Sequence, residues 1–282
     1  MNLVIQGPAI QPKDAEALAE LTSAAHIEPV SAHAFRLRGA SRGREAEVRA
    51  YCENARLDYG FVAQGRSLDQ FGLLVTDMDS TLITIECIDE IADMVGVKPE
   101  VAQITASAMR GEIDFAESLT RRVALLKGLE QESLQRVYDE RLRLSPGADR
   151  MLAALKAHGI RILLVSGGFT FFTERLKQGL DLDFTASNTL EITNGKLTGR
   201  VLGKILDARG KADALHRVRA QLGLSREQVI GMGDGANDLA MLAQAGISIA
   251  YHAKPVVREK TTYSINYSGL DALLNLLAAA TE

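Results

Sequence analysis

Acidic residues follow two of the apolar runs in this sequence. Asp77 and Asp79 follow one run, and Asp234 follows another after a single glycine. Three carboxylates that converge on one centre raise one another's pKa unless a cation lies between them. Carboxylate oxygens are ligands that Mg²⁺ prefers, and Mg²⁺ often shares its coordination with a phosphate. Each pattern alone is also typical of a tight turn, but their joint occurrence favours a magnesium site.

A serine, a glycine and a lysine could hold the phosphate group itself. Ser166 and Gly167 follow a third apolar run, where a glycine lets the backbone approach a ligand closely. Lys211 lies near the start of a predicted helix and could supply fixed positive charge for phosphoryl transfer. Asn237 lies in the Gly-Asp-Gly-Ala-Asn-Asp segment that contains Asp234 and is a further candidate for phosphate contact. Alone, each of these residues is as well explained by a turn or a solvated surface.

The elements that must position these residues read as a parallel sheet. Nearly continuous apolar runs at 71–76, 161–165, 229–232 and 247–250 are typical of buried parallel strands. Helical stretches separate the runs, which favours an α/β sheet with right-handed crossovers. Ligands of such sheets bind outside the carboxyl ends of the strands, where the candidate residues fall.

Two segments fall outside this pattern. About 85 residues separate the first two core strands, against roughly a dozen for a typical crossover. The segment reads as helices, so we expect a helical-bundle cap at about 84–143 that closes over the sheet edge. Residues 1–66 show a β-α-β-β-α-β order, which predicts a small ferredoxin-like α+β domain. Residues 67–282 would then form the catalytic domain, a parallel Rossmann-like sheet with the cap inserted.

The composition limits the possible binding partners and the cellular compartment of the protein. The net charge of −4 offers no concentrated positive charge for nucleic acid or a membrane surface. No stretch reaches the ~18 apolar residues of a membrane span, and the N-terminus lacks the pattern of a signal peptide. The two cysteines, Cys52 and Cys87, are too few and too far apart for a disulfide framework, so we expect a cytoplasmic protein.

The four groups of residues, in this order, resemble the haloacid dehalogenase superfamily of phosphohydrolases. The stretch 77–81 is similar to its Asp-x-Asp-x-Thr motif, and Ser166, Lys211 and the stretch 233–238 are similar to its other three motifs. The resemblance implies Mg²⁺ bound by Asp77, the backbone carbonyl of Asp79, and Asp234. It implies that Asp77 is a nucleophile that forms a phospho-aspartate and that Asp79 is the general acid and base.

The resemblance narrows to the phosphoserine phosphatase family, through the segments 79–90, 165–169 and 115–123. It implies hydrolysis of O-phospho-L-serine to L-serine and phosphate, the last step of L-serine biosynthesis. It also implies that Glu86 and Arg122 bind the amino-acid end of the substrate, with Met109 and Phe115 lining the pocket. From residue types alone, Glu90, Glu112 and Arg121 would serve as well.

Two other functions remain open at this point. A phosphohydrolase or phosphotransferase of the same superfamily with another small phosphomonoester would carry the same catalytic motifs. A non-catalytic sensor of serine or phosphate is the alternative from a different class, although it would not need the nucleophile Asp77. The sequence leaves the oligomeric state open, with a homodimer among the alternatives.

Overall fold

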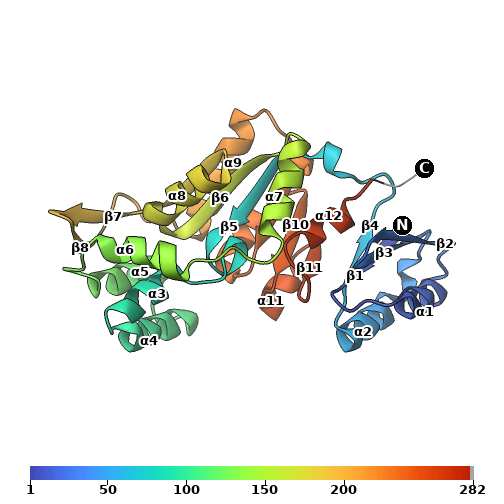
Figure 1. Ribbon diagram of the computed structural model, residues 1–282, viewed down its shortest axis with the longest axis horizontal. Helices are drawn as coiled ribbons and strands as arrows, with labels where there is room; N and C mark the ends of the chain where they lie inside the picture. Colours follow the sequence, from blue (N-terminus) through green and yellow to red (C-terminus); the bar gives the residue numbers. More distant parts are fainter. Residues whose placement is uncertain (280–282) are drawn as a thin grey trace.

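The computed structural model describes residues 1–279 as two sheets and the helices that cover them. One sheet has four strands in the order β2-β3-β1-β4, and the other has seven in the order β11-β10-β9-β5-β6-β7-β8. In Figure 1 the four-stranded sheet and the helices α3 to α5 lie on opposite sides of the parallel sheet. No helix among the described residues is long and apolar enough to cross a membrane.

Residues 1–66, here called the N-terminal unit, form the antiparallel sheet. Its elements follow the order expected from the sequence: β1 (Asn2–Gln6), α1 (Pro12–Thr22), β2 (His26–Ser31), β3 (Ala34–Arg38), α2 (Glu45–Ala55) and β4 (Asp58–Val62). The central strand β1 pairs antiparallel with both β3 and β4. Buried apolar side chains of the sheet and of α1 and α2, including Leu3, Leu18 and Val48, form a core between them.

The larger sheet contains every apolar run that we predicted as a strand. Its strands are β5 (Leu73–Asp77), β6 (Arg161–Phe169), β7 (Phe184–Thr193), β8 (Lys196–Leu202), β9 (Val229–Gly233), β10 (Ile247–Tyr251) and β11 (Tyr263–Ile265). All neighbours are parallel except β7 and β8, which form an antiparallel hairpin with Asn194 and Gly195 at its turn. The helices that accompany this sheet are α7 (Ala148–Ala157), α8 (Thr170–Leu180), α9 (Ala208–Gln221), α10 (Leu239–Leu242), α11 (Pro255–Arg258) and α12 (Ala272–Leu276).

The long insertion between β5 and β6 is helical, as expected. It contains α3 (Cys87–Met94), α4 (Lys98–Met109), α5 (Phe115–Ala124) and α6 (Glu132–Arg136), the last continued by a helical turn at Val137–Arg141. The loop between α5 and α6 is hydrogen-bonded to the β7–β8 hairpin: Gly128 N donates to Leu197 O, and Gln131 N to Gly195 O, both at 2.8 Å. These bonds fix the α5–α6 end of the insertion to the sheet.

The N-terminal unit packs against the edge strand β11 and the helix α12 of the larger sheet. Val4 and Val62 belong to the same apolar cluster as Leu273 and Leu276. A Cβ added to Gly60 would lie 2.7 Å from the ring of Tyr263, so this position needs a glycine for the two sheets to approach. The contact is therefore a close apolar one.

Candidate active site

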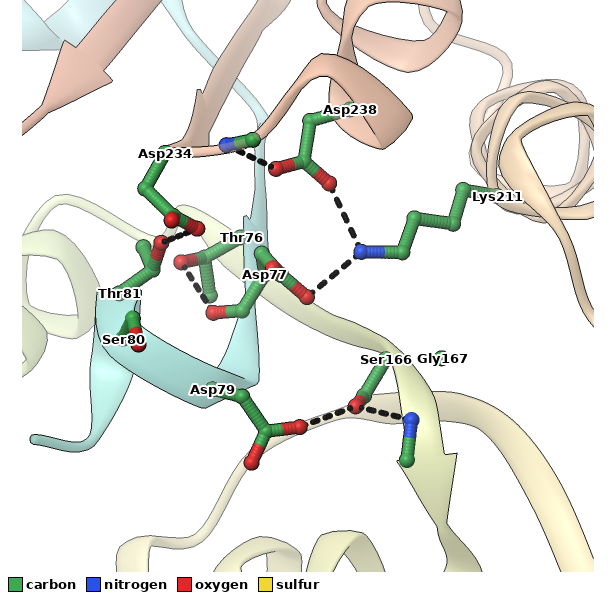
Figure 2. A network of polar contacts seen from close by, with 12 residues as sticks. Thr76, Asp77, Asp79, Ser80, Thr81, Ser166, Gly167, Lys211, Asp234 and Asp238 are labelled. Atoms are coloured by element: carbon green, nitrogen blue, oxygen red, sulfur yellow. Dashed lines mark hydrogen bonds and ion pairs between the residues drawn. The ribbon is translucent and has the colours of Figure 1, made fainter. Parts of the chain in front are cut away.

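The carboxyl ends of three adjacent strands bring the predicted residues together. In the sheet, β5 lies between β9 and β6, so Asp77 at the end of β5 is central. Asp234 follows β9, and Ser166 lies near the end of β6. The fully buried runs of β5 and β9 fix these ends rigidly, because both faces of the sheet are covered. Polar groups at strand ends therefore meet in one place (Figure 2).

Asp77 shares a buried ion-pair network with Lys211 and Asp238. Lys211 Nζ donates to Asp77 Oδ1 and to Asp238 Oδ1, each at 2.7 Å, and the lysine is 1% exposed. Burial alone would lower the pKa of Lys211, but the charges of Asp77 and Asp238 raise it above its ordinary value. Burial and the charge of Asp238 raise the pKa of Asp77, against the opposing effect of Lys211. The lysine therefore stays charged and faces the carboxylate predicted as the nucleophile.

Asp79 is held by the start of α3 and by Ser166, in the last part of β6. Cys87 N donates to Asp79 Oδ1 at 2.9 Å, and Ser166 Oγ donates to Asp79 Oδ2 at 3.2 Å. Ser80, with a φ of 55°, turns the chain back toward α3. Burial raises the pKa of Asp79, although its hydrogen bonds oppose the shift. A carboxyl group with a raised pKa can give and retake a proton, which suits a general acid and base.

The loop after Val165 approaches Asp79 and the cap so closely that glycines are needed. A Cβ on Gly168 would lie 2.9 Å from Asp79 Oδ2, and one on Gly167 would lie 2.9 Å from the ring of Phe115. Ser166 is fully buried, and its hydroxyl also accepts a hydrogen bond from Gly168 N at 2.8 Å. In this arrangement the hydroxyl is bonded to Asp79 and Gly168, so direct phosphate contact by Ser166 stays a prediction.

A cluster of three aspartates could hold a metal ion. Carboxylate oxygens of Asp77, Asp234 and Asp238 all lie within 4.8 Å of one another. Asp238 is already bonded through Oδ1 to Lys211 and through Oδ2 to Gly235 N. Burial and the charge of Asp238 raise the pKa of Asp234, so a cation bound among the three carboxylates would offset the repulsion between them. The hard oxygen donors therefore fit a divalent cation; the carboxylate of Asp79 lies outside this cluster.

A cavity of about 430 Å³ extends from these residues to the cap. Asp77, Asp79 and Lys211 line one part of it, while Glu86 and Arg122 line the cap side. The other lining residues include those predicted from the sequence: Gly167, Asn237, Met109 and Phe115. The cavity therefore joins the strand-end carboxylates and Lys211 to a region that carries one acidic and one basic side chain.

Burial shifts the pKa values of the two charged residues on the cap side. Burial first, and then the charge of Asp79, raise the pKa of Glu86 to about 7, and Ser80 Oγ donates to Glu86 Oε1 at 2.6 Å. Burial lowers the pKa of Arg122, against the opposing charges of Asp89 and Glu86. A zwitterionic ligand would supply a counter-charge to each side chain.

The structure separates these two residues from the alternatives that residue types left open. Glu90 pairs with Arg141 at 2.6 Å, Glu112 with Arg110 at 2.6 Å, and Arg121 with Glu117 at 2.5 Å. None of Glu90, Glu112 and Arg121 is among the described residues that line the cavity. Their charges are already paired on the cap surface.

Sequence reasoning missed several contributors to the site, among them Lys254 and a backbone donor. Lys254 lines the cavity and follows β10, so the strand-end argument could have found it had it been applied to the fourth apolar run. The backbone N–H of Cys87 binds Asp79, and no side-chain pattern signals a main-chain donor. Cys87 lies on α3, in the insertion predicted to be helical, whereas Lys254 directly precedes α11, a helix that was not predicted.

Comparison with known proteins agrees with this geometry. Residues 74–243 match the model of the haloacid dehalogenase-like hydrolase family, and residues 3–48 match a domain of unknown function, DUF4072. The chain is 56% identical over 215 residues to a phosphoserine phosphatase of Polaromonas sp., covering 74% of this chain and 91% of that protein.

Solved structures show the same likeness. The chain matches a probable phosphoserine phosphatase of Vibrio cholerae with a TM-score of 0.86 and 38% identity, covering 99% of this chain and 87% of that one. It also matches a phosphoserine phosphatase solved as an analogue of its phospho-aspartyl intermediate, with a TM-score of 0.69 and 38% identity. That match covers 73% of this chain and 99% of the other.

Proposed function

The chain belongs to the phosphoserine phosphatase family of haloacid dehalogenase-like hydrolases, and from that premise we propose that it hydrolyses O-phospho-L-serine to L-serine and phosphate. One observation carries the proposal. A single cavity joins Asp77, Asp79 and Lys211 to Glu86 and Arg122. The first three suit phosphoryl transfer, and the last two match the ammonium and carboxylate of an amino acid.

The first chemical step breaks the phosphate ester. A carboxylate oxygen of Asp77 attacks phosphorus, and the bond from phosphorus to the seryl oxygen breaks. Asp79 gives its proton to the departing seryl oxygen, which its raised pKa favours. Lys211 supplies positive charge beside Asp77, which supports charge stabilisation on the transferred group. The products of this step are L-serine and a phospho-aspartate on Asp77.

The second step restores the enzyme. Asp79, now ionised, takes a proton from water, and the hydroxide equivalent attacks phosphorus of the phospho-aspartate. The bond between phosphorus and Asp77 breaks, so that phosphate leaves and the carboxylate of Asp77 is free again. Ser166, Gly167 and Asn237 are the residues that we assign to the phosphate oxygens, on the strength of their places around the strand ends.

Substrate choice falls to the cap side of the cavity. We assign Glu86 to the ammonium of phosphoserine and Arg122 to its carboxylate, since an arginine binds a carboxylate through two parallel hydrogen bonds. Glu86 needs its charge for this, and a bound ammonium favours the ionised form of a carboxyl whose pKa is otherwise about 7. Met109 and Phe115 line the same cavity as Glu86 and Arg122 and form an apolar part of its wall.

The proposed cofactor is Mg²⁺, held by Asp77, Asp234 and the backbone carbonyl of Asp79. The oxygen donor set and the mutual repulsion of the aspartates support a divalent cation. When bound, the ion would orient the phosphate and offset its charge. Asp238, engaged with Lys211 and Gly235, would support the lysine.

We also propose a division into an N-terminal domain, 1–66, and a phosphatase domain, 67–282, with the cap at about 84–143. The two separate sheets support it. A cytoplasmic location is proposed as well, supported by the two free, buried cysteines.

Phosphate release tests the proposed function. Purified protein with Mg²⁺ is compared on phosphoserine, phosphothreonine, phosphoethanolamine and p-nitrophenyl phosphate. Phosphoserine should give the highest kcat/KM. Phosphoethanolamine lacks the carboxylate for Arg122, p-nitrophenyl phosphate lacks both charges, and phosphothreonine has both charges but adds a methyl group next to the phosphate ester. A higher kcat/KM on any of the other three would reject phosphoserine as the preferred substrate.

A further inference from the structure

The side chain of Asn188 joins two segments that carry phosphate-site residues. Asn188 lies on β7 and is 2% exposed. Its Nδ2 donates to Gly167 O at 2.8 Å, and its Oδ1 accepts from Leu206 N at 2.7 Å. Both ends of the amide are therefore used, and neither partner belongs to β7.

The hydrogen bond from Asn188 Nδ2 to Gly167 O replaces a backbone hydrogen bond that is missing between β6 and β7. Pairing between β6 and β7 joins Val165 to Ala186 and next joins Phe169 to Asn188, so residues 166–168 stand opposite Ser187 alone. The loop with Ser166 and Gly167 therefore bulges out of the ladder, as strands often do beside active sites. The carbonyl of Gly167 is left without a strand partner there, and the amide of Asn188 supplies the donor.

The second bond holds the approach to α9. Leu206 directly precedes Asp207, which begins α9 as its N-cap and accepts from Gly210 N at 2.8 Å. Lys211 lies in the first turn of the same helix, and its backbone N donates to Asp207 O at 2.9 Å. The bond to Leu206 therefore fixes the chain five residues before the lysine that contacts Asp77.

We propose that Asn188 is a positioning residue that sets the distance between the Ser166–Gly167 loop and Lys211, and through them the fit of the phosphate group. The inference rests on the proposed function. Asn188 is not among the described residues that line the cavity, so it acts through its two partners. A shift of about 1 Å in groups that hold a reacting phosphate can cost roughly 100-fold in rate.

Two variants remove both hydrogen bonds in different ways. Asn188→Ala leaves space, while Asn188→Leu fills the space with an apolar side chain of similar size, so that their common effect reports the lost bonds. Ser187→Ala is the matched control on the same strand. It removes the 2.7 Å bond between Ser187 Oγ and Thr173 Oγ, which involves neither Gly167 nor Leu206.

Binding of orthophosphate and of L-serine to the Mg²⁺-loaded protein, each measured by calorimetry, separates positioning from general damage. We expect both Asn188 variants to bind orthophosphate about 10-fold more weakly, equivalent to ~1.4 kcal/mol. Their L-serine affinity should stay within about 2-fold, since Glu86 and Arg122 lie on the cap side. Ser187→Ala should lower Tm with both affinities unchanged.

Orthophosphate affinity equal to wild type in whichever Asn188 variant is folded would overturn the proposal. An equal loss of orthophosphate and L-serine affinity would also overturn it, because that pattern indicates a general defect. The proposed function is judged separately, by phosphate release from phosphoserine in the wild-type protein. Orthophosphate binding needs no turnover, so it decides the role of Asn188 even if phosphoserine is not the substrate.

Discussion

Lys211 Nζ lies 2.7 Å from Asp77 Oδ1 and also 2.7 Å from Asp238 Oδ1, so the predicted nucleophile is half of a buried ion pair whose lysine has a second partner. Lys211 therefore keeps its ion pair with Asp238 when the carboxylate of Asp77 is phosphorylated or replaced. Removing one partner of a buried pair usually costs about 3–5 kcal/mol because it leaves a charge uncompensated. Here Asp238 limits that cost when Asp77 loses its charge.

Asp77→Asn should abolish turnover while leaving the fold intact. An amide does not attack phosphorus, and losing a nucleophile typically lowers kcat by roughly 10⁴-fold or more. Rapid acid quenching with labelled substrate should trap phospho-protein in the wild type and none in the variant. Circular dichroism should show the same fold, since Lys211 keeps its bond to Asp238. Substantial turnover in a folded Asp77→Asn protein would disprove the covalent mechanism.

Chelation of metal should abolish activity, and Mg²⁺ should restore it. Asp234→Asn should raise the Mg²⁺ concentration needed for half-maximal activity by about 10–100-fold or more, because it removes a charged ligand. The matched control is Asp149→Asn, an exposed aspartate of α7 outside the cavity. Activity that survives EDTA would exclude a required metal, and equal effects of the two substitutions would remove Asp234 from the metal site.

The sequence predicted the frame of this site well because the frame depends on local patterns. The apolar runs at 71–76 and 229–232 became β5 and β9, and the strand ends brought Asp77 and Asp234 together as expected. The helical insertion and the β-α-β-β-α-β order were predicted with boundaries a few residues from those observed. Buried parallel strands carry a strong signal, since both of their faces must be apolar.

What the sequence could not show are contacts that depend on tertiary packing. The bulge at 166–168 and its bond to Asn188 arise only when β6 lies beside β7. The choice of Arg122 over Arg121 depends on which face of α5 turns toward the cavity, and both residues suit a carboxylate. The short strand β11 was not predicted, because three residues give too little periodicity.

The pH dependence of kcat/KM for phosphoserine should reflect the protonation of Glu86. Its pKa is about 7 in the free protein, so the side chain is neutral below that pH and ionised above it. A neutral carboxyl cannot pair with the ammonium of phosphoserine, so kcat/KM should rise as the pH rises through about 7. This rise in kcat/KM should be missing in Glu86→Gln. The pH profile of each protein on p-nitrophenyl phosphate serves as the control, because it shows the effects of ionisation of the phosphate and of Asp79 without the ammonium. An unchanged profile in Glu86→Gln would assign the rise to another group.

Arg122→Ala should raise KM for phosphoserine steeply. Truncating one partner of a desolvated charge pair costs about 2–5 kcal/mol, which is roughly 30-fold to several thousand-fold. Slow hydrolysis of p-nitrophenyl phosphate, which has no carboxylate, should barely change. Arg121→Ala provides the control, because Arg121 is exposed and paired with Glu117, and a surface pair contributes ~0–1 kcal/mol.

The comparison of the two arginine variants leaves little ambiguity. Equal loss on both substrates in Arg122→Ala would indicate a damaged cap. A larger effect of Arg121→Ala on phosphoserine would mean that the carboxylate is bound by the other arginine of α5.

The contact between the two sheets predicts that the N-terminal unit contributes to stability and not to catalysis. Asp58, 2% exposed on β4, accepts backbone hydrogen bonds from Asn266 at 2.6 Å, Tyr267 at 3.2 Å and Ser268 at 2.9 Å. These donors follow β11 of the larger sheet, so one side chain links the two units. An amide cannot accept at both positions, so Asp58→Asn should leave a buried N–H without a partner, at about 1–3 kcal/mol.

Asp58→Asn should therefore lower Tm while kcat on phosphoserine stays within about 2-fold, because Asp58 lies outside the catalytic cavity. Glu53→Gln, at an exposed position of α2, should change neither. A chain that begins at Ser67 should lose more stability, since it exposes Leu273 and Leu276, yet it should keep catalysis. A soluble, folded protein from Ser67 onward without phosphatase activity would show instead that the N-terminal unit takes part in catalysis.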